Sequence, residues 1–149
     1  MPPPQFGGVQ RQITHIVVHS AATPPTMDIG AEQIRQWHVN RGWSTIGYHF
    51  VIRRSGKLEL GRELAIAGAH VAGQNARSIG ICLVGGADAI KRPENNFTPA
   101  QMFQLADLLR QLLKRWPTAV VCGHRDMPGT ATACPSFDVQ RWWAEVTSD

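Results

Sequence analysis

Residues 79–84 read IGICLV, and none of these six side chains is charged. A strand that is apolar at every position is typical of a sheet covered on both faces, so we predict a central buried strand here. A second apolar and β-branched stretch, residues 13–19, reads ITHIVVH. Its alternation predicts another strand, with Val17 and His19 on the same face.

Further strands and helices alternate along the chain around these two segments. Turn signals and alternation predict three more strands, over residues 48–53, 57–60 and 119–122. Apolar residues at helical spacing predict three helices, over residues 31–41, 98–116 and 136–146. Thr98 opens the second helix with a capping box, and Ser136 is the expected cap of the third. The pattern predicts a single α/β domain with a mixed central β-sheet of about five strands and helices on both faces.

Length and composition restrict the chain to one domain. Its 149 residues are 43% hydrophobic and 17% charged, which is enough apolar material for one core. No window of about twenty residues is free of charge, which excludes a membrane-spanning helix. The net charge of +4 favours anionic partners such as nucleic acid, lipid headgroups or cell-wall polymers, and it selects none of them. The arginines are scattered along the chain, which argues against nucleic-acid binding, and a monomer is the expected state.

The start of the chain differs in composition from the rest. Residues 1–12 begin MPPPQFGG, which predicts a flexible N-terminal arm ahead of a domain spanning residues 13–149. This arm lacks the charged region and apolar stretch of a secretory signal, so we expect the protein to stay in the cytoplasm where it is made. Of the three cysteines, Cys82 and Cys122 lie in apolar runs, where free cysteine packs as a small hydrophobe, and no disulfide framework is expected.

Histidine and cysteine side chains stand at the ends of predicted elements. His19 ends the first strand, His124 follows the last strand, and Cys134 lies in a loop with little apolar material. These three side chains would meet at one sheet edge if the two strands are neighbours, and imidazole and thiolate are the ligands that zinc takes. Cys122 shares a face with His124 and is an alternative ligand, although its apolar flanks favour a place in the core.

Four separated motifs carry a resemblance to a known family. They are HIVVHS at residues 15–20, GYHF at 47–50, SIGI at 78–81, and GHRD at 123–126 followed by Cys134-Pro135. In order and spacing they resemble type 2 N-acetylmuramoyl-L-alanine amidases, over about residues 13–143. Within this family the chain is most similar to the amidase-type lysozymes (endolysins) of short-tailed coliphages, and animal peptidoglycan-recognition proteins share the fold.

The resemblance implies a zinc enzyme. It makes His19, His124 and Cys134 the zinc ligands, with the fourth position left for water, as in catalytic zinc sites. The implied reaction is hydrolysis of the amide between N-acetylmuramic acid and L-alanine in bacterial peptidoglycan, with residues 13–149 as the zinc amidase domain. Tyr48 is the expected catalytic partner, because strand alternation turns it and His49 to opposite faces.

The resemblance also implies further site residues. The phage enzymes carry lysine two residues before the cysteine ligand, where this chain has Thr132, a second expected catalytic residue that lacks the charge. His70 resembles a position in the substrate groove. By residue type, we add three further expected substrate contacts, Trp37, Trp43 and Arg77, with packing as the alternative role of the two tryptophans.

Two other functions remain open at the level of sequence. One is a peptidoglycan-binding module without hydrolysis; the other is a cytoplasmic amidase that recycles anhydromuropeptides, although those relatives usually carry aspartate where Cys134 stands. The similarity to phage lysozymes further implies a phage or prophage endolysin that reaches the wall after a holin permeabilises the host membrane. It also implies a regulatory partner, the phage RNA polymerase.

Overall fold

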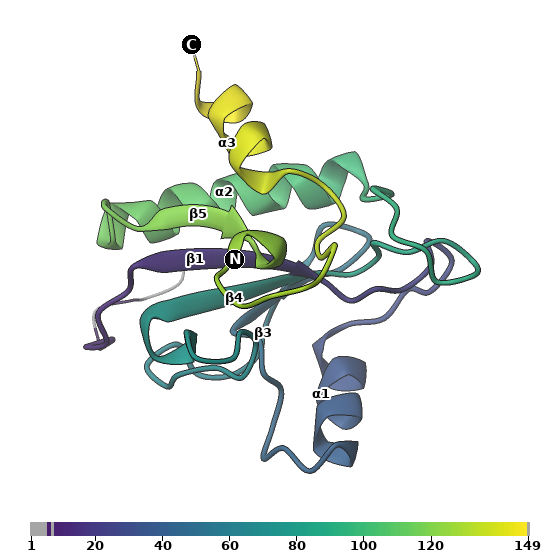
Figure 1. Ribbon diagram of the computed structural model, residues 1–149, viewed down its shortest axis with the longest axis horizontal. Coiled ribbons are helices and arrows are strands. Elements are labelled where there is room, and N and C mark those ends of the chain that lie inside the picture. Colours follow the sequence, from purple (N-terminus) through teal and green to yellow (C-terminus); the bar gives the residue numbers. More distant parts are fainter. Residues whose placement is uncertain (1–5, 7, 149) are drawn as a thin grey trace.

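A five-stranded mixed β-sheet forms the centre of the computed structural model, which describes residue 6 and residues 8–148 (Figure 1). Its strands are β1 (His15–Ser20), β2 (Phe50–Ile52), β3 (Leu58–Leu60), β4 (Ser78–Leu83) and β5 (Val120–Gly123). The spatial order is β3-β2-β4-β1-β5, and only β3 runs antiparallel to its neighbour. β4 lies at the centre and is buried along its whole length, which confirms the central strand expected from its apolar sequence.

Helices cover both faces of this sheet, as predicted. The helices are α1 (Ala31–Asn40), α2 (Pro99–Arg115) and α3 (Val139–Thr147), with two short 3₁₀-helices, η1 (Asn75–Arg77) and η2 (His124–Asp126). α2 and α3 lie on one side of the sheet and α1 lies on the other (Figure 1). The larger core is on the α2 side, where alternate residues of the strands, such as Ile16 and Ile81, pack against Leu105 and Leu109.

The capping box at the start of α2 also ties this helix to the sheet. Thr98 Oγ1 accepts a hydrogen bond from Gln101 N–H at 3.1 Å, and Gln101 Oε1 accepts one from Thr98 N–H at 3.0 Å. The Gln101 amide then donates to the carbonyl oxygens of Ile52 and Val84, at the ends of β2 and β4. One buried glutamine therefore fixes the helix start over two strand ends.

Several element boundaries differ from the sequence-based expectation, mostly by one or two residues. α3 begins at Val139 with Asp138 as its cap, because the Asp138 carboxylate accepts from Arg141 N–H. The expected cap, Ser136, instead donates its hydroxyl proton to the Gly86 carbonyl oxygen at 2.8 Å. The strand expected from residue 48 begins at Phe50.

The described part of the expected N-terminal arm packs onto the domain. The Phe6 ring lies 5.8 Å from the Trp116 ring, and Val9 is only 5% exposed. The Arg11 guanidinium donates to the carbonyl oxygens of Leu64 and Ser78, among others. Apolar burial and these hydrogen bonds hold residue 6 and residues 8–12 against the body, while residues 1–5 and 7 lie outside the described residues. Within the described chain, no helix is long and apolar enough to cross a membrane.

Candidate functional site

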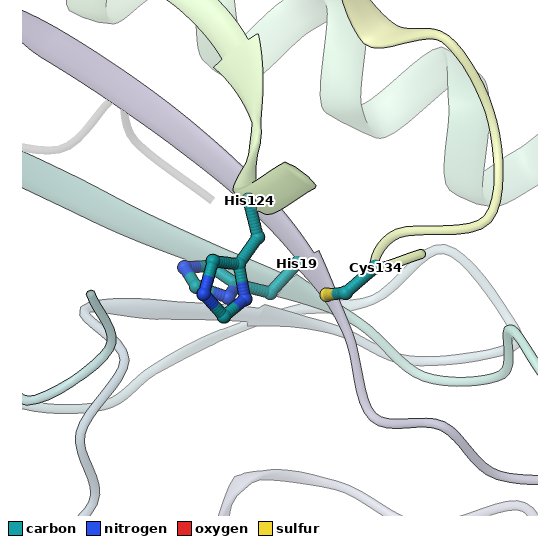
Figure 2. A group of neighbouring side chains, drawn as sticks. All are labelled: His19, His124 and Cys134. Carbon is teal, nitrogen blue, oxygen red and sulfur yellow. The ribbon is translucent and has the colours of Figure 1, made fainter. Parts of the chain in front are cut away.

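The three proposed metal ligands meet at one end of the sheet (Figure 2). β1 and β5 are parallel neighbours, with Val18 opposite Gly123, so His19 near the end of β1 lies beside His124, which follows β5. The loop after η2 brings Cys134 to the same place. One ligand atom from each of the three side chains lies within 4.8 Å of the others. The predicted convergence of the two strand ends is confirmed.

The donor set fits zinc. Tetrahedral zinc with bonds of about 2.0–2.3 Å separates its ligand atoms by roughly 3.3–3.6 Å, so a limited side-chain rotation would close the present spacing. Burial lowers the pKa of His124, and it lowers the pKa of His19 well below the usual range, with the charges of His70 and His124 adding to the effect. Both imidazoles are therefore neutral near pH 7 and offer a lone pair.

Cys134 is held by the residue that follows His19. Ser20 directs its backbone N–H at the Cys134 Sγ at 3.2 Å, and its hydroxyl lies 3.8 Å from the same sulfur. Burial raises the pKa of the Cys134 thiol, and the two Ser20 groups oppose this shift because hydrogen bonds favour the thiolate. Sequence reasoning missed Ser20, although its place next to His19 is a signal that it lies near the ligands.

Tyr48 lies beside the ligand group. Its ring centroid is 5.0 Å from that of His19 and 5.5 Å from that of His38, and the His38 ring in turn lies 4.5 Å from Trp43. Burial raises the pKa of Tyr48 well above its ordinary value, with contributions from Cys82 and Cys134, so its hydroxyl keeps its proton and is a hydrogen-bond donor. A row of rings thus runs from His19 to the partly exposed Trp43.

Thr132 lies near Cys134, and its hydroxyl makes a local hydrogen bond to the backbone of Cys134. Its Oγ1 accepts a hydrogen bond from Cys134 N–H at 3.1 Å, and its side chain is exposed. The two residues line a small pocket of about 120 Å³ that Lys91 also lines, from the loop after β4. Lys91 has φ +67°, a backbone conformation uncommon outside glycine, asparagine and aspartate. Sequence spacing gives no signal for this cation, which lies 41 to 43 positions before Thr132 and Cys134.

Of the other residues expected to contact substrate, only His70 lies next to the ligand group, whereas Trp37 and Arg77 lie elsewhere. His70 is next to the ligand group, with its Nδ1 2.9 Å from His19 Nε2. Trp37 is half-buried and packs against the smaller core cluster around Ile34, on the α1 side. Arg77 is exposed and immediately precedes β4, at the opposite end of this strand from Cys82, the register partner of His19.

The buried side chain of His49 makes the stability of the fold depend on pH. Its Nδ1 accepts from Gly80 N–H at 3.1 Å, and its Nε2–H donates to the Ile66 carbonyl oxygen at 2.8 Å. Burial lowers the pKa of His49 from 6.5 to about 4. Above pH 6.5 both folded and unfolded chains carry neutral His49; between pH 6.5 and 4 only the unfolded chain binds the proton, so stability falls as pH falls.

We expect this one histidine to remove roughly 3 kcal/mol of unfolding free energy between pH 6.5 and 4. Urea unfolding of zinc-free protein at pH 7 and pH 4.5 measures the loss, and His49→Gln is the comparison. The variant is expected to be less stable at pH 7, by about 1 kcal/mol for the lost Gly80 hydrogen bond, but to lose less stability on acidification. Equal acid sensitivity of the two proteins would contradict the assignment.

Comparison with known proteins places this chain in a family. It matches the protein family described as N-acetylmuramoyl-L-alanine amidase over residues 9–137. It is 50% identical over 143 residues to the endolysin of Klebsiella phage KP32 and 47% identical over 144 residues to that of Escherichia phage T7. These alignments cover 94% of this chain in both cases, and 93% and 94% of the two relatives.

Solved structures share the fold. The endolysin amidase LysCS from Clostridium intestinale superimposes with a TM-score of 0.78 at 31% identity, over 93% of this chain and 86% of that one. The Drosophila peptidoglycan-recognition protein PGRP-LB gives a TM-score of 0.72 at 24% identity, over 94% of this chain and 82% of that one, a likeness of fold alone. The family match and the two nearly full-length endolysin relatives show that the chain belongs to the N-acetylmuramoyl-L-alanine amidase family.

Proposed function

We propose that this protein is a zinc-dependent phage endolysin that hydrolyses the amide between N-acetylmuramic acid and L-alanine in peptidoglycan. The observation that carries the proposal is the meeting of His19, His124 and Cys134, with Tyr48 beside them, in a chain of the amidase family. The two nearly full-length relatives named as phage endolysins support the same substrate and setting.

His19, His124 and Cys134 would hold the zinc ion. When bound, zinc supplies a Lewis acid for the scissile carbonyl and lowers the pKa of water from about 15.7 to about 7. Three protein ligands are the number found in catalytic zinc sites, where a fourth position stays open. Ser20 positions the Cys134 sulfur by its backbone N–H, which keeps that ligand in place as substrate enters.

Tyr48 acts on the substrate in this proposal. Its protonated hydroxyl donates a hydrogen bond to the oxygen of the scissile carbonyl as negative charge develops there. A donor fixed before the reaction stabilises the transition state more than the ground state, because it needs no reorganisation. The packing of Tyr48 against the cluster that contains Ile46 and Cys82 supports such a fixed position.

Lys91 supplies a cation at the Cys134 side of the site in this proposal. Peptidoglycan stem peptides carry free carboxylates, and the pocket that Lys91 and Thr132 line is also lined by the candidate ligand Cys134. Lys91→Gln is expected to lower kcat/KM about fivefold at low ionic strength, since an exposed ion pair contributes about 1 kcal/mol. The effect shrinks in high salt.

The control for this prediction is Lys57→Gln, an exposed lysine in the β2-β3 turn. Steady-state hydrolysis of a soluble muropeptide at low and high salt gives both values. If Lys91→Gln and Lys57→Gln have the same kcat/KM at low salt, Lys91 has no role in substrate binding.

The proposed function is tested with purified peptidoglycan. We expect the zinc-loaded protein to release soluble fragments and to expose new L-alanine amino termini, and chelation to stop both. Peptidoglycan binding with bound zinc but without new termini would instead identify a recognition module. New termini at another residue would identify a different peptidase or amidase specificity.

The cellular setting is part of the same proposal. An endolysin made in the host cytoplasm reaches its substrate after a holin permeabilises the membrane, and it acts as a monomer. A pull-down with the cognate phage RNA polymerase tests the regulatory partner expected from the resemblance.

A further inference from the structure

Both ring nitrogens of His70 are paired with other protein side chains, in a chain of hydrogen bonds that begins at His19. Its Nδ1 is 2.9 Å from His19 Nε2, and its Nε2 is 3.2 Å from Ser78 Oγ. The Ser78 hydroxyl in turn donates to the Gln74 carbonyl oxygen at 2.8 Å. One continuous path therefore joins His19 on β1 to three groups within residues 70–78.

The end of this path determines where every proton lies. A carbonyl oxygen only accepts, so the single hydroxyl proton of Ser78 is committed to Gln74. Ser78 Oγ must then accept from His70 Nε2–H, which leaves His70 Nδ1 as a lone pair. His70 Nδ1 accordingly accepts a hydrogen bond from His19 Nε2–H, and the free lone pair of His19 is on Nδ1.

We infer that His70 is a positioning residue that holds His19 as the Nε2–H tautomer, so that His19 presents Nδ1 to the metal. The inference rests on the proposed zinc site and specifies how one of its ligands is oriented. A ligating histidine is commonly fixed by a hydrogen bond from its other ring nitrogen. Here that partner is a second histidine, 51 residues away in the chain.

The surrounding backbone is shaped to hold the His70 ring. A Cβ at Gly80 would lie 2.7 Å from His70 Cγ, and one at Gly68 would lie 2.7 Å from His70 Cδ2. Asn75 Oδ1 accepts the backbone N–H groups of His70 and Val71, both at 2.9 Å. The ring thus fills a space that only glycine at positions 68 and 80 leaves open, and its backbone is tied in place.

This role differs from the substrate contact expected for His70 from sequence. Both ring nitrogens are engaged inside the protein, so neither is free for a hydrogen bond to peptidoglycan. The loss caused by replacing His70 is therefore expected first in metal affinity, and not in KM.

Zinc affinity of two His70 variants tests the inference. Asn places its Oδ1 near the position of the histidine Nδ1 and keeps the acceptor for His19, whereas Leu removes it. By competition with a chelator, His70→Leu is expected to bind zinc 10- to 100-fold more weakly than wild type. His70→Asn is expected to stay within a few-fold of wild type. Equal affinity of His70→Leu and wild type, or equal loss in both variants, would overturn the role.

A variant that leaves His70 unchanged gives a second test. Gly80→Ala introduces one methyl group against the ring and is expected to weaken zinc binding as well, whereas Gly8→Ala, which meets nothing within 4 Å, serves as the matched control. Thermal unfolding of each zinc-free protein verifies that it is folded. If folded Gly80→Ala protein binds zinc as tightly as Gly8→Ala protein, the space at Gly80 does not position the His70 ring for zinc binding.

Long-range proton–nitrogen NMR of the imidazoles reads the tautomer directly. The zinc-bound wild type is expected to show His19 protonated at Nε2 and metal-coordinated at Nδ1, and zinc-bound His19 protonated at Nδ1 would refute the inference. These measurements need no peptidoglycan. If wild type fails to bind zinc, the proposed function itself fails; if it binds zinc with the other tautomer, only the role of His70 fails.

Discussion

Cys134→Ser protein is expected to fold, to lose its zinc, and to release L-alanine termini from peptidoglycan at least about 10³-fold more slowly than wild type. The thiolate is the anionic ligand of the proposed set, and a serine hydroxyl does not deprotonate to replace it near pH 7. Loss of the metal removes several kcal/mol of transition-state stabilisation, and about 4 kcal/mol corresponds to 10³-fold. Metal content and the rate of terminus release, measured on the same sample, give both quantities.

Cys122→Ser is the matched control. Cys122 was the alternative ligand by strand parity, but its thiol lies in the core, 3.6 Å from Met127 Sδ. This variant is expected to keep its zinc and most of its activity while losing some stability, since a buried hydroxyl lacks a good partner there. Zinc retained at one equivalent by Cys134→Ser, or lost by Cys122→Ser in folded protein, would show that the ligand set is wrong.

Tyr48→Phe is expected to lower kcat by about 10²–10³-fold while zinc content stays unchanged. The substitution keeps the ring that packs near His19 and removes only the hydroxyl, the proposed donor to the developing oxyanion. KM is expected to change little, because the lost interaction strengthens in the transition state. Steady-state kinetics on a soluble muropeptide separate the two constants.

The outcome for Tyr48 is distinct from that for the metal ligands. A Tyr48→Phe protein with full zinc and wild-type kcat would assign Tyr48 to packing alone, as a half-buried aromatic against the cluster around Ile46. Loss of zinc in this variant would instead show that Tyr48 supports the ligands. Metal analysis of each preparation therefore accompanies the kinetics.

The sequence predicted those helices and strands that are determined by residues close together in the chain. The apolar run at residues 79–84 became the buried central strand, and the capping box at Thr98 set the start of α2. Both depend on neighbours within a few residues. The predicted cap at Ser136 was wrong because that hydroxyl is drawn to Gly86, 50 residues earlier in the chain, and Asp138 caps the helix instead.

The candidate ligands His19, His124 and Cys134 could also be named from sequence, because their places at two strand ends and in a loop with little apolar material made them candidates and the family resemblance implied the set. The residues that surround these three side chains could not be predicted from sequence. Ser20 meets Cys134 across 114 residues, His70 meets His19 across 51, and Lys91 reaches the Cys134 pocket from another loop. Sequence by itself determined the strands, the helices and the candidate metal ligands, since these follow from local pattern and motif. Only the tertiary structure decided which groups orient those side chains, because hydrogen bonds between distant loops depend on how the whole chain packs.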